Sequence, residues 1–125
     1  MSKTLSNSYI SAFCTELSML QNAGISPYDG VMMLIDDEKT KDGLAVLKSI
    51  LPPLEQGFPL SDALKKSGVF PKYVEDMVET GEQTGRQTEA LTALAAHYER
   101  QERISIAIKN AVGATLTYVG FAKGL

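Results

Sequence analysis

The chain has 125 residues, of which 44% are apolar and 22% charged, so it can bury one hydrophobic core without a disulfide or a metal. Its net charge of −3 and pI near 5.1 argue against a nucleic-acid-binding protein, which would carry a basic stripe. The single cysteine, Cys14, excludes an internal disulfide and fits a reducing compartment. It falls on an apolar helix face, which predicts a packing role rather than a reactive thiol.

The sequence predicts different structures for the two ends of the chain. Residues 1–7 lack the apolar segment of a signal peptide and are predicted to be a flexible N-terminus. Residues 8–110 are predicted to form one helical domain, and residues 111–125 the start of a truncated membrane-spanning helix or its stub. The stretch Ala111–Ala122 carries no charge, but its twelve residues are fewer than the roughly 20 of a complete span. By length alone, a final helix packed on the domain is the commoner case.

Apolar residues recur every three or four positions, which is the period of helices with one buried face. The first pattern covers Ser8–Ala23 and ends at Gly24. A second begins at Ser26-Pro27, a typical helix start, and leads to a charged connection at Asp36–Thr40. The stripes of these two helices comprise Ile10, Phe13, Cys14, Leu17, Leu20, Tyr28, Val31, Met32 and Ile35.

A third and a fourth helix are predicted next. The third begins near Lys41, and Pro52-Pro53 predicts a kink or break near Ile50–Leu51, because proline lacks an amide donor and clashes with the preceding turn. The fourth is expected to start with Ser61 as its cap and to stop at Gly68.

Two glycines separate the last two predicted helices. The fifth helix starts at Pro71, and a sixth pattern runs from about Gln87. Glycine inside a helix costs about 1 kcal/mol relative to alanine, so Gly81 and Gly85 indicate either a tight turn or very close backbone packing. The turn is favoured, with Gly85 in a left-handed conformation. No strand pattern occurs in the chain. The predicted fold is all-α, a compact six-helix bundle with antiparallel neighbours and a last helix that runs toward a membrane span.

No catalytic constellation is visible. There is one histidine, His97, and the di-iron motif, a zinc site of cysteines and histidines and a phosphate-binding glycine loop are all absent from the sequence. Cys14 and His97 could form a nucleophile–base pair only with a third residue that orients the histidine, and no sequence pattern indicates such a residue. The sequence therefore predicts no enzyme, no catalytic residues and no cofactor.

Two charged segments are candidate contact surfaces. Glu75, Glu79 and Glu82 are spaced to share one face of the fifth helix, which is either solvated, a docking face for a basic partner, or a weak Ca²⁺ or Mg²⁺ site. In the sixth helix, Glu99–Arg103 is charged and Lys109 is the last charge before the apolar end, as in a juxtamembrane helix. The candidate partner-contact residues are Glu75, Glu79, Glu82, Glu99, Arg100 and Arg103.

The segment Met77–Gly85 resembles the Met-x-x-x-Gly-Glu-x-Ser/Thr-Gly motif of the F-family platform proteins of type II secretion and type IV pilus systems. The similarity extends over about Ser8 to Ala111 and includes the Ala23–Ser26 turn, while Gln87 stands where the family usually has an apolar residue. The motif residues are Phe70, Pro71, Met77, Gly81, Glu82, Thr84, Gly85, Leu91, Leu94, Ala95, Tyr98 and Glu99.

This resemblance implies a non-enzymatic domain on the cytoplasmic side of the cell (inner) membrane, and the short N-terminal lead suggests the first of two related domains. Its implied partners are the assembly ATPase, pilin-like subunits, other platform and assembly proteins and, through the full-length protein, the membrane and further copies of itself. No nucleic acid is implied. The domain would couple the ATPase to pilin subunit addition. The alternative is a free-standing soluble helical adaptor or scaffold.

Overall fold

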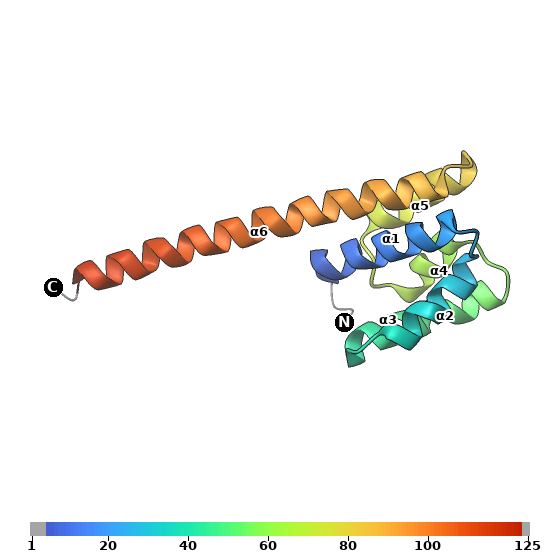
Figure 1. Ribbon diagram of the computed structural model, residues 1–125, viewed down its shortest axis with the longest axis horizontal. Helices are drawn as coiled ribbons and strands as arrows, with labels where there is room; N and C mark the ends of the chain where they lie inside the picture. Colours follow the sequence, from blue (N-terminus) through green and yellow to red (C-terminus); the bar gives the residue numbers. More distant parts are fainter. Residues whose placement is uncertain (1–4, 124–125) are drawn as a thin grey trace.

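The structure is a computed structural model that describes the backbone of residues 5–123 and the side chains of residues 5–113. This part of the chain forms six helices and no strand, which confirms the predicted all-α fold. Figure 1 shows the first five helices gathered into a bundle, with the sixth running along it and beyond. The helices are α1 (Asn7–Asn22), α2 (Pro27–Asp37), α3 (Lys41–Glu55), α4 (Leu60–Ser67), α5 (Lys72–Gln83) and α6 (Gln87–Lys123).

Serine hydroxyls cap the N-termini of α1 and α2. The Oγ of Ser26 accepts a hydrogen bond from the backbone N–H of Asp29 at 3.2 Å, as predicted for a helix cap. Ser6 does the same for the N–H of Tyr9 at 3.0 Å, so α1 begins one residue before its predicted start. Leu5 packs against the core. Leu5 and Ser6 therefore belong to the folded domain, while residues 1–4 of the predicted flexible segment lie outside the described residues.

Of the predicted kink or break in α3, the break does not occur, because the helix runs through Pro52 and Pro53 to Glu55. The two prolines lie in the last turn, where they remove only the amide donors that would bond the carbonyls of Lys48 and Ser49. Both of those residues are exposed, so water can bond their carbonyls instead. A proline pair at the solvated end of a helix is therefore tolerated without an interruption.

The buried face of α2 differs from the predicted stripe. Met32, expected to face inward, is 43% exposed, whereas Val31 and Leu34 are buried. Gly30 is also on the buried face and lies against α1, where a Cβ at this position would come within 2.9 Å of Leu17 Cδ1. A stripe drawn from apolar side chains alone overlooks such a glycine contact, and so misplaces the helix face.

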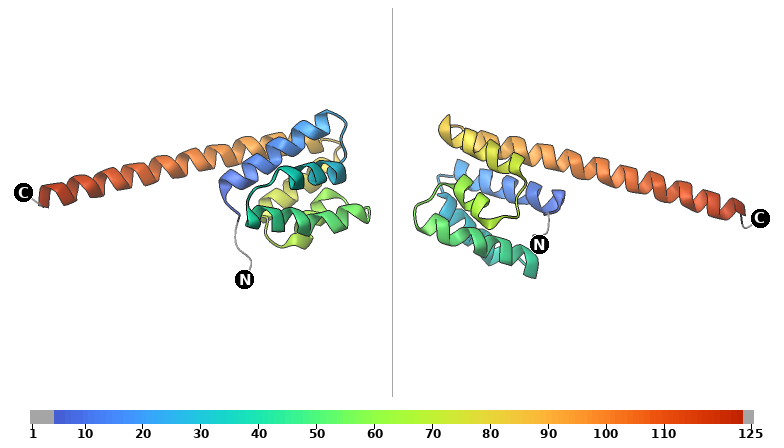
Figure 2. Two further views of the ribbon diagram at one scale, coloured as in Figure 1. Left: turned by 60° about the horizontal axis from the view of Figure 1, so that its bottom comes forward. Right: turned by 180° about the vertical axis from the view of Figure 1, so that it is seen from behind.

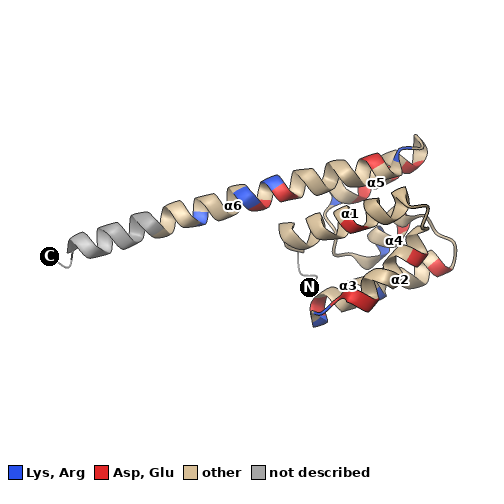
Figure 3. Cartoon of the chain, in the orientation of Figure 1, with Lys and Arg blue, Asp and Glu red and all other residues tan. Residues whose placement is uncertain are grey.

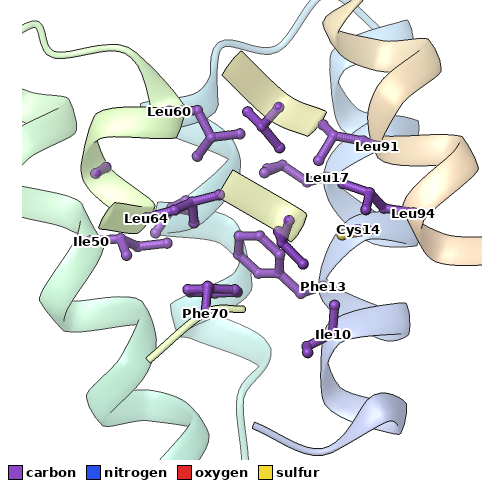
Figure 4. Packing of buried hydrophobic residues seen from close by; sticks show 14 of the residues in the cluster. Ile10, Phe13, Cys14, Leu17, Ile50, Leu60, Leu64, Phe70, Leu91 and Leu94 are labelled. Atoms are coloured by element: carbon purple, nitrogen blue, oxygen red, sulfur yellow. The ribbon is translucent and has the colours of Figure 1, made fainter. Parts of the chain in front are cut away.

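Buried side chains from all six helices meet in a single core. Figure 4 shows Phe13 of α1 close to Phe70, which precedes α5, and their ring centroids are 5.2 Å apart. Leu91 and Leu94 of α6 enter the same core, and each is 0% exposed. The long last helix is thus anchored by its first three turns.

α6 runs antiparallel to α1 and then leaves the bundle (Figures 1 and 2). The hydroxyl of Ser11 donates to the carbonyl of Ala95 at 3.0 Å, and the hydroxyl of Thr88 donates to Oε1 of Gln21 at 3.0 Å. Among the described side chains of α6, Tyr98 is the last buried one. The helix beyond it, as far as residue 113, is therefore not buried by the rest of the described chain.

Cys14 is buried in α1, which confirms the predicted packing role, and burial raises the pKa of its thiol to about 12. We expect native Cys14 to react with iodoacetamide at about pH 8 at least about a hundredfold more slowly than in unfolded protein, because the thiolate is the nucleophile. Mass spectrometry with and without concentrated urea measures both rates. A Cys14→Ser/Ser49→Cys variant, with an exposed thiol, serves as the control. Equal rates for Cys14 in the two conditions would contradict the expectation.

Candidate functional site

Backbone hydrogen bonds of the Schellman type close the α5–α6 turn. Gly85 has a φ of +72°, the left-handed conformation that glycine adopts without strain. Its N–H donates to the carbonyl of Glu82 at 3.5 Å, and the N–H of Arg86 donates to the carbonyl of Gly81 at 2.6 Å. Thr84 is the C-cap residue of α5. The predicted turn is confirmed at Gly85.

Gly81 has a different role from Gly85. It lies inside α5 and is buried against the first turn of α6. A Cβ at this position would lie 2.9 Å from Cβ of Ala90 and 3.0 Å from both the carbonyl oxygen of Arg86 and Cα of Gln87. Close backbone packing, the alternative to a turn, therefore also occurs, at the other glycine of the pair.

Glu82 links α5 to the beginning of α4. Its Oε2 accepts a hydrogen bond from the N–H of Ser61 at 2.9 Å, and its Oε1 accepts one from the Ser61 hydroxyl at 2.5 Å. Nε2 of Gln87 donates to Oε2 at 3.2 Å. Pro59, the N-cap residue of α4, makes no side-chain hydrogen bond. The prediction of Ser61 as the cap is therefore wrong. A carboxylate from another helix accepts from one free N–H of the first turn of α4, that of Ser61, and its negative charge complements the helix dipole.

The predicted acidic face is only partly open. Glu79 forms an ion pair with Lys65 of α4 at 2.6 Å, and the hydrogen bond to Glu79 raises the pKa of the lysine. Glu75 is half-buried. Glu82 shares the helix face with these two residues, but its carboxylate is hydrogen-bonded to Ser61 of α4. Among the described side chains, no group of three or more carboxylate, histidine or cysteine residues is arranged to hold a metal ion.

A cleft of about 550 Å³ lies between the α1–α2 connection and the α5–α6 turn. Gly24 lines it on one side, and Arg86 on the other. Gln21 reaches it from α1, where its Oε1 is bonded by Thr88 while its buried Nε2 has no partner in the described part of the chain. The cleft thus lies between the turn at Gly24 and the turn at Gly85, both of which resemble family motifs. Sequence reasoning missed this contact, because Gln21 and Thr88 are 67 residues apart and belong to no common pattern.

The charged segment of α6 lies just past the bundle (Figure 3). Nη1 of Arg103 is 3.9 Å from a carboxylate oxygen of Glu99, and both side chains are more than 60% exposed, so this pair contributes little to stability. Arg100 is exposed as well. Beyond them Ile104 and Ile108 are 53% and 58% exposed.

In the described part of the chain, no helix has both the length and the apolar character required to cross a bilayer. The predicted start of a span, residues 111–125, lies largely outside the described side chains. Residues 111–113 are exposed, whereas the side chains of residues 114–125 lie outside the described part.

Most of the family-motif residues on α6 belong to the core rather than to a surface. Leu91, Leu94, Ala95 and Tyr98 are buried, whereas Glu99 is exposed. Ahead of them in the chain, Phe70 is buried, Pro71 is the N-cap residue of α5 and Met77 is half-buried. Phe70, Leu91, Leu94, Ala95 and Tyr98 of the motif therefore contribute to the hydrophobic core.

His97 packs among aromatic rings. Its ring centroid is 5.2 Å from that of Tyr73 and 5.0 Å from that of Tyr98. No hydrogen bond joins it to Cys14 in the described structure, so the two residues are not arranged as a nucleophile and its base.

Comparison with known proteins places this fold in a family. The family profile described as "Type II secretion system (T2SS), protein F" matches residues 13–122. A "Protein transport protein HofC homolog" of Escherichia coli is 34% identical over 98 residues, which cover 78% of this chain and 24% of the relative. The "Type IV pilus assembly protein PilC" of Thermus thermophilus is 23% identical over 116 residues, which cover 93% of this chain and 29% of that protein.

The chain spans about a quarter of the length of these two relatives. The matched region contains the complete α2 to α5 bundle, the glycine turn between α5 and α6 and the bonded Glu82. The chain belongs to the family of type II secretion system protein F.

Proposed function

We propose that this chain is a non-enzymatic cytoplasmic domain of an inner-membrane platform protein for pilus or pseudopilus assembly or for type II secretion. In this proposal the bundle contacts the assembly ATPase and helps to couple its motion to the addition of pilin-like subunits. Family membership supports the general role, because the two relatives are named for protein transport and for type IV pilus assembly.

The observation that carries the proposal is the exposed part of α6. Ile104 and Ile108 are one helical turn apart and share a face, while Ile106, at 46% exposure, points to the opposite side. Val112 is 52% exposed. Exposed apolar side chains therefore occur on two sides of this segment, between the charged Arg103 and Lys109. Exposed apolar surface of this kind marks a contact with a partner or a membrane more often than isolated apolar residues do. Such a segment directly after a charged one supports a path from the bundle toward the bilayer.

Charged residues on α5 and α6 are the proposed contacts with the ATPase. Glu75 and Glu79 lie on α5, and Glu99, Arg100 and Arg103 on α6. The ion pairs of Glu79 and Glu99 involve side chains that are at least one-third exposed, so a partner could exchange them for its own. Glu82 is left out of the proposed contacts because its carboxylate is already bonded inside the bundle.

We expect charge reversal in the full-length protein to remove the assembly ATPase from it. The variants are Glu75→Lys/Glu79→Lys and Arg100→Glu/Arg103→Glu, and each should reduce co-purification from solubilised membranes by about tenfold or more, as for other complementary charged surfaces. The matched control reverses two exposed carboxylates on α3, Glu55→Lys/Asp42→Lys.

Membrane fractionation of the same cells checks the second half of the proposal. The full-length protein should be found in the inner-membrane fraction at a level unchanged by the variants. Recovery in the soluble fraction would instead favour a free-standing helical adaptor. Unchanged ATPase recovery with both double variants would refute the proposed contact surface.

A further inference from the structure

An apolar groove with an acidic rim runs between α1 and α2, away from the charged surfaces of α5 and α6. It encloses about 200 Å³. Leu34 is buried beneath it and Leu20 is half-buried, and both belong to or pack on the core. A smaller hollow of about 70 Å³ adjoins it, since Glu16 and Leu34 line both. The groove is lined by Glu16, Met19, Leu20, Met33, Leu34 and Asp37.

Two exposed methionines form the walls of the groove. Met19 is 65% exposed and Met33 is 45% exposed, and Met32 beside them is 43% exposed. Methionine is flexible and polarisable, and it is over-represented on surfaces that accept apolar side chains of a partner. Clustered exposed apolar side chains on a domain indicate a contact surface more often than isolated ones do.

The rim carries negative charge that the fold does not neutralise. Burial, with the nearby charges of Asp37 and Glu38, raises the pKa of Glu16. Hydrogen bonds from Thr40 hold Glu38 in its charged form and lower its pKa. Within the described residues, no lysine or arginine forms an ion pair with any of these three carboxylates. Lys39, the nearest cation along the chain, is exposed.

The placement of these carboxylates also opposes the helix dipole. Asp36 and Asp37 lie in the last turn of α2, which contains no basic residue. Negative charge at a helix C-terminus is unfavourable, and mutual repulsion with Glu16 adds to this. Glu38 is stabilised by its hydrogen bonds from Thr40, whereas a cationic partner would relieve the unfavourable placement of Asp37 and its repulsion with Glu16.

We propose that the α1–α2 groove binds a basic amphipathic helix of a partner protein, which inserts an apolar side chain between Met19 and Met33 and places Lys or Arg beside Glu16 and Asp37. Recognition of an amphipathic helix by an apolar groove is a common mode of binding. Charge complementarity at the rim fixes the orientation of the helix and excludes acidic partners. This surface is separate from the proposed ATPase contacts on α5 and α6.

The test uses this 125-residue chain with a defined probe. The probe is a helical peptide of about 18 residues, roughly five turns, with leucine on one face and lysine on the other. Methyl-labelled methionine reports the site directly, because the resonances of Met19 and Met33 should shift on titration while that of half-buried Met77 stays fixed. A peptide of the same length with glutamate in place of lysine should not bind.

Matched variants separate the groove from general attraction between opposite charges. Glu16→Gln/Asp37→Asn should weaken binding by about tenfold or more, while Glu55→Gln/Glu89→Gln, with the same change of net charge, should alter the Kd by less than about twofold. Met19→Ser/Met33→Ser should also weaken it by about tenfold. An equal loss in both charge variants, or shifts spread over all methionines, would overturn the proposal. So would a failure of the lysine peptide to bind. The charge variants should not unfold the chain, since removing the Glu16–Asp37 repulsion favours the fold.

Discussion

Replacing Glu82 with alanine is expected to lower the free energy of unfolding by about 2–4 kcal/mol, since it removes charge-assisted hydrogen bonds and leaves buried donors unpaired. Ser61 is 3% exposed, so neither its N–H nor its hydroxyl can readily turn to water. Gln87 would lose its bond as well. Urea denaturation followed by circular dichroism measures the change.

Two further variants identify the cause of this loss. Glu82→Gln keeps the shape and one acceptor oxygen, so its stability should lie between those of the wild type and Glu82→Ala. Glu89→Ala removes a carboxylate from the same end of the bundle, but that side chain is 72% exposed and its contact with Arg86 is 3.8 Å, so a change below about 0.5 kcal/mol is expected. A Glu82→Ala protein as stable as Glu89→Ala would show that the bond to α4 is not structural.

Gly81→Ala is expected to lower the free energy of unfolding by about 1–3 kcal/mol, which is typical of overpacking in a rigid contact. In an open helix the same substitution would stabilise by about 1 kcal/mol, because alanine has the higher helix propensity. Here the added methyl group meets the backbone of Arg86 and Gln87 at 3.0 Å and the short side chain of Ala90 at 2.9 Å. None of these can move aside without shifting α6 relative to α5.

Calorimetric melting of Gly81→Ala measures the loss, and Thr80→Ala is the control. Thr80 is the preceding residue on α5 and is exposed, so its change should stay within about 0.5 kcal/mol. Gly81→Val should be worse than Gly81→Ala because it adds two further carbons to the same contact. A Gly81→Ala protein that melts above the wild type would mean that the α5–α6 contact yields easily.

Periodicity and capping residues predict α1 and the start of α2 well. The apolar steps at Ile10, Phe13 and Leu17 follow the helical period whatever the helix packs against, and Ser26 caps α2 through a bond only three residues long. The effect of the proline pair in α3, by contrast, cannot be predicted from local signals. Whether Pro52 breaks a helix depends on whether the carbonyls it leaves unpaired can reach water, and a local pattern does not contain that information.

In the candidate site, too, local features can be predicted from the sequence and contacts between distant residues cannot. Gly85 could be read from the sequence because a left-handed turn is a local conformation that glycine favours. The spacing of Glu75, Glu79 and Glu82 predicts that they share one face of α5, but it does not predict that the carboxylate of Glu82 bonds to α4. Its partner Ser61 is 21 residues away on another helix, and no spacing rule connects them.

Local sequence patterns are enough to predict the six helices in the described part of this protein, the glycine turn between α5 and α6 and the motif that resembles its family. The helices and the turn depend on interactions between residues a few positions apart. The motif is recognised by comparing its residues with those of the family. Only the tertiary structure decided which charges are free. Glu82 is bonded to α4 and Glu79 is paired with Lys65, while Glu16 and Asp37 both line the α1–α2 groove. The free energy of a charge depends on the neighbours that folding brings to it from distant parts of the chain.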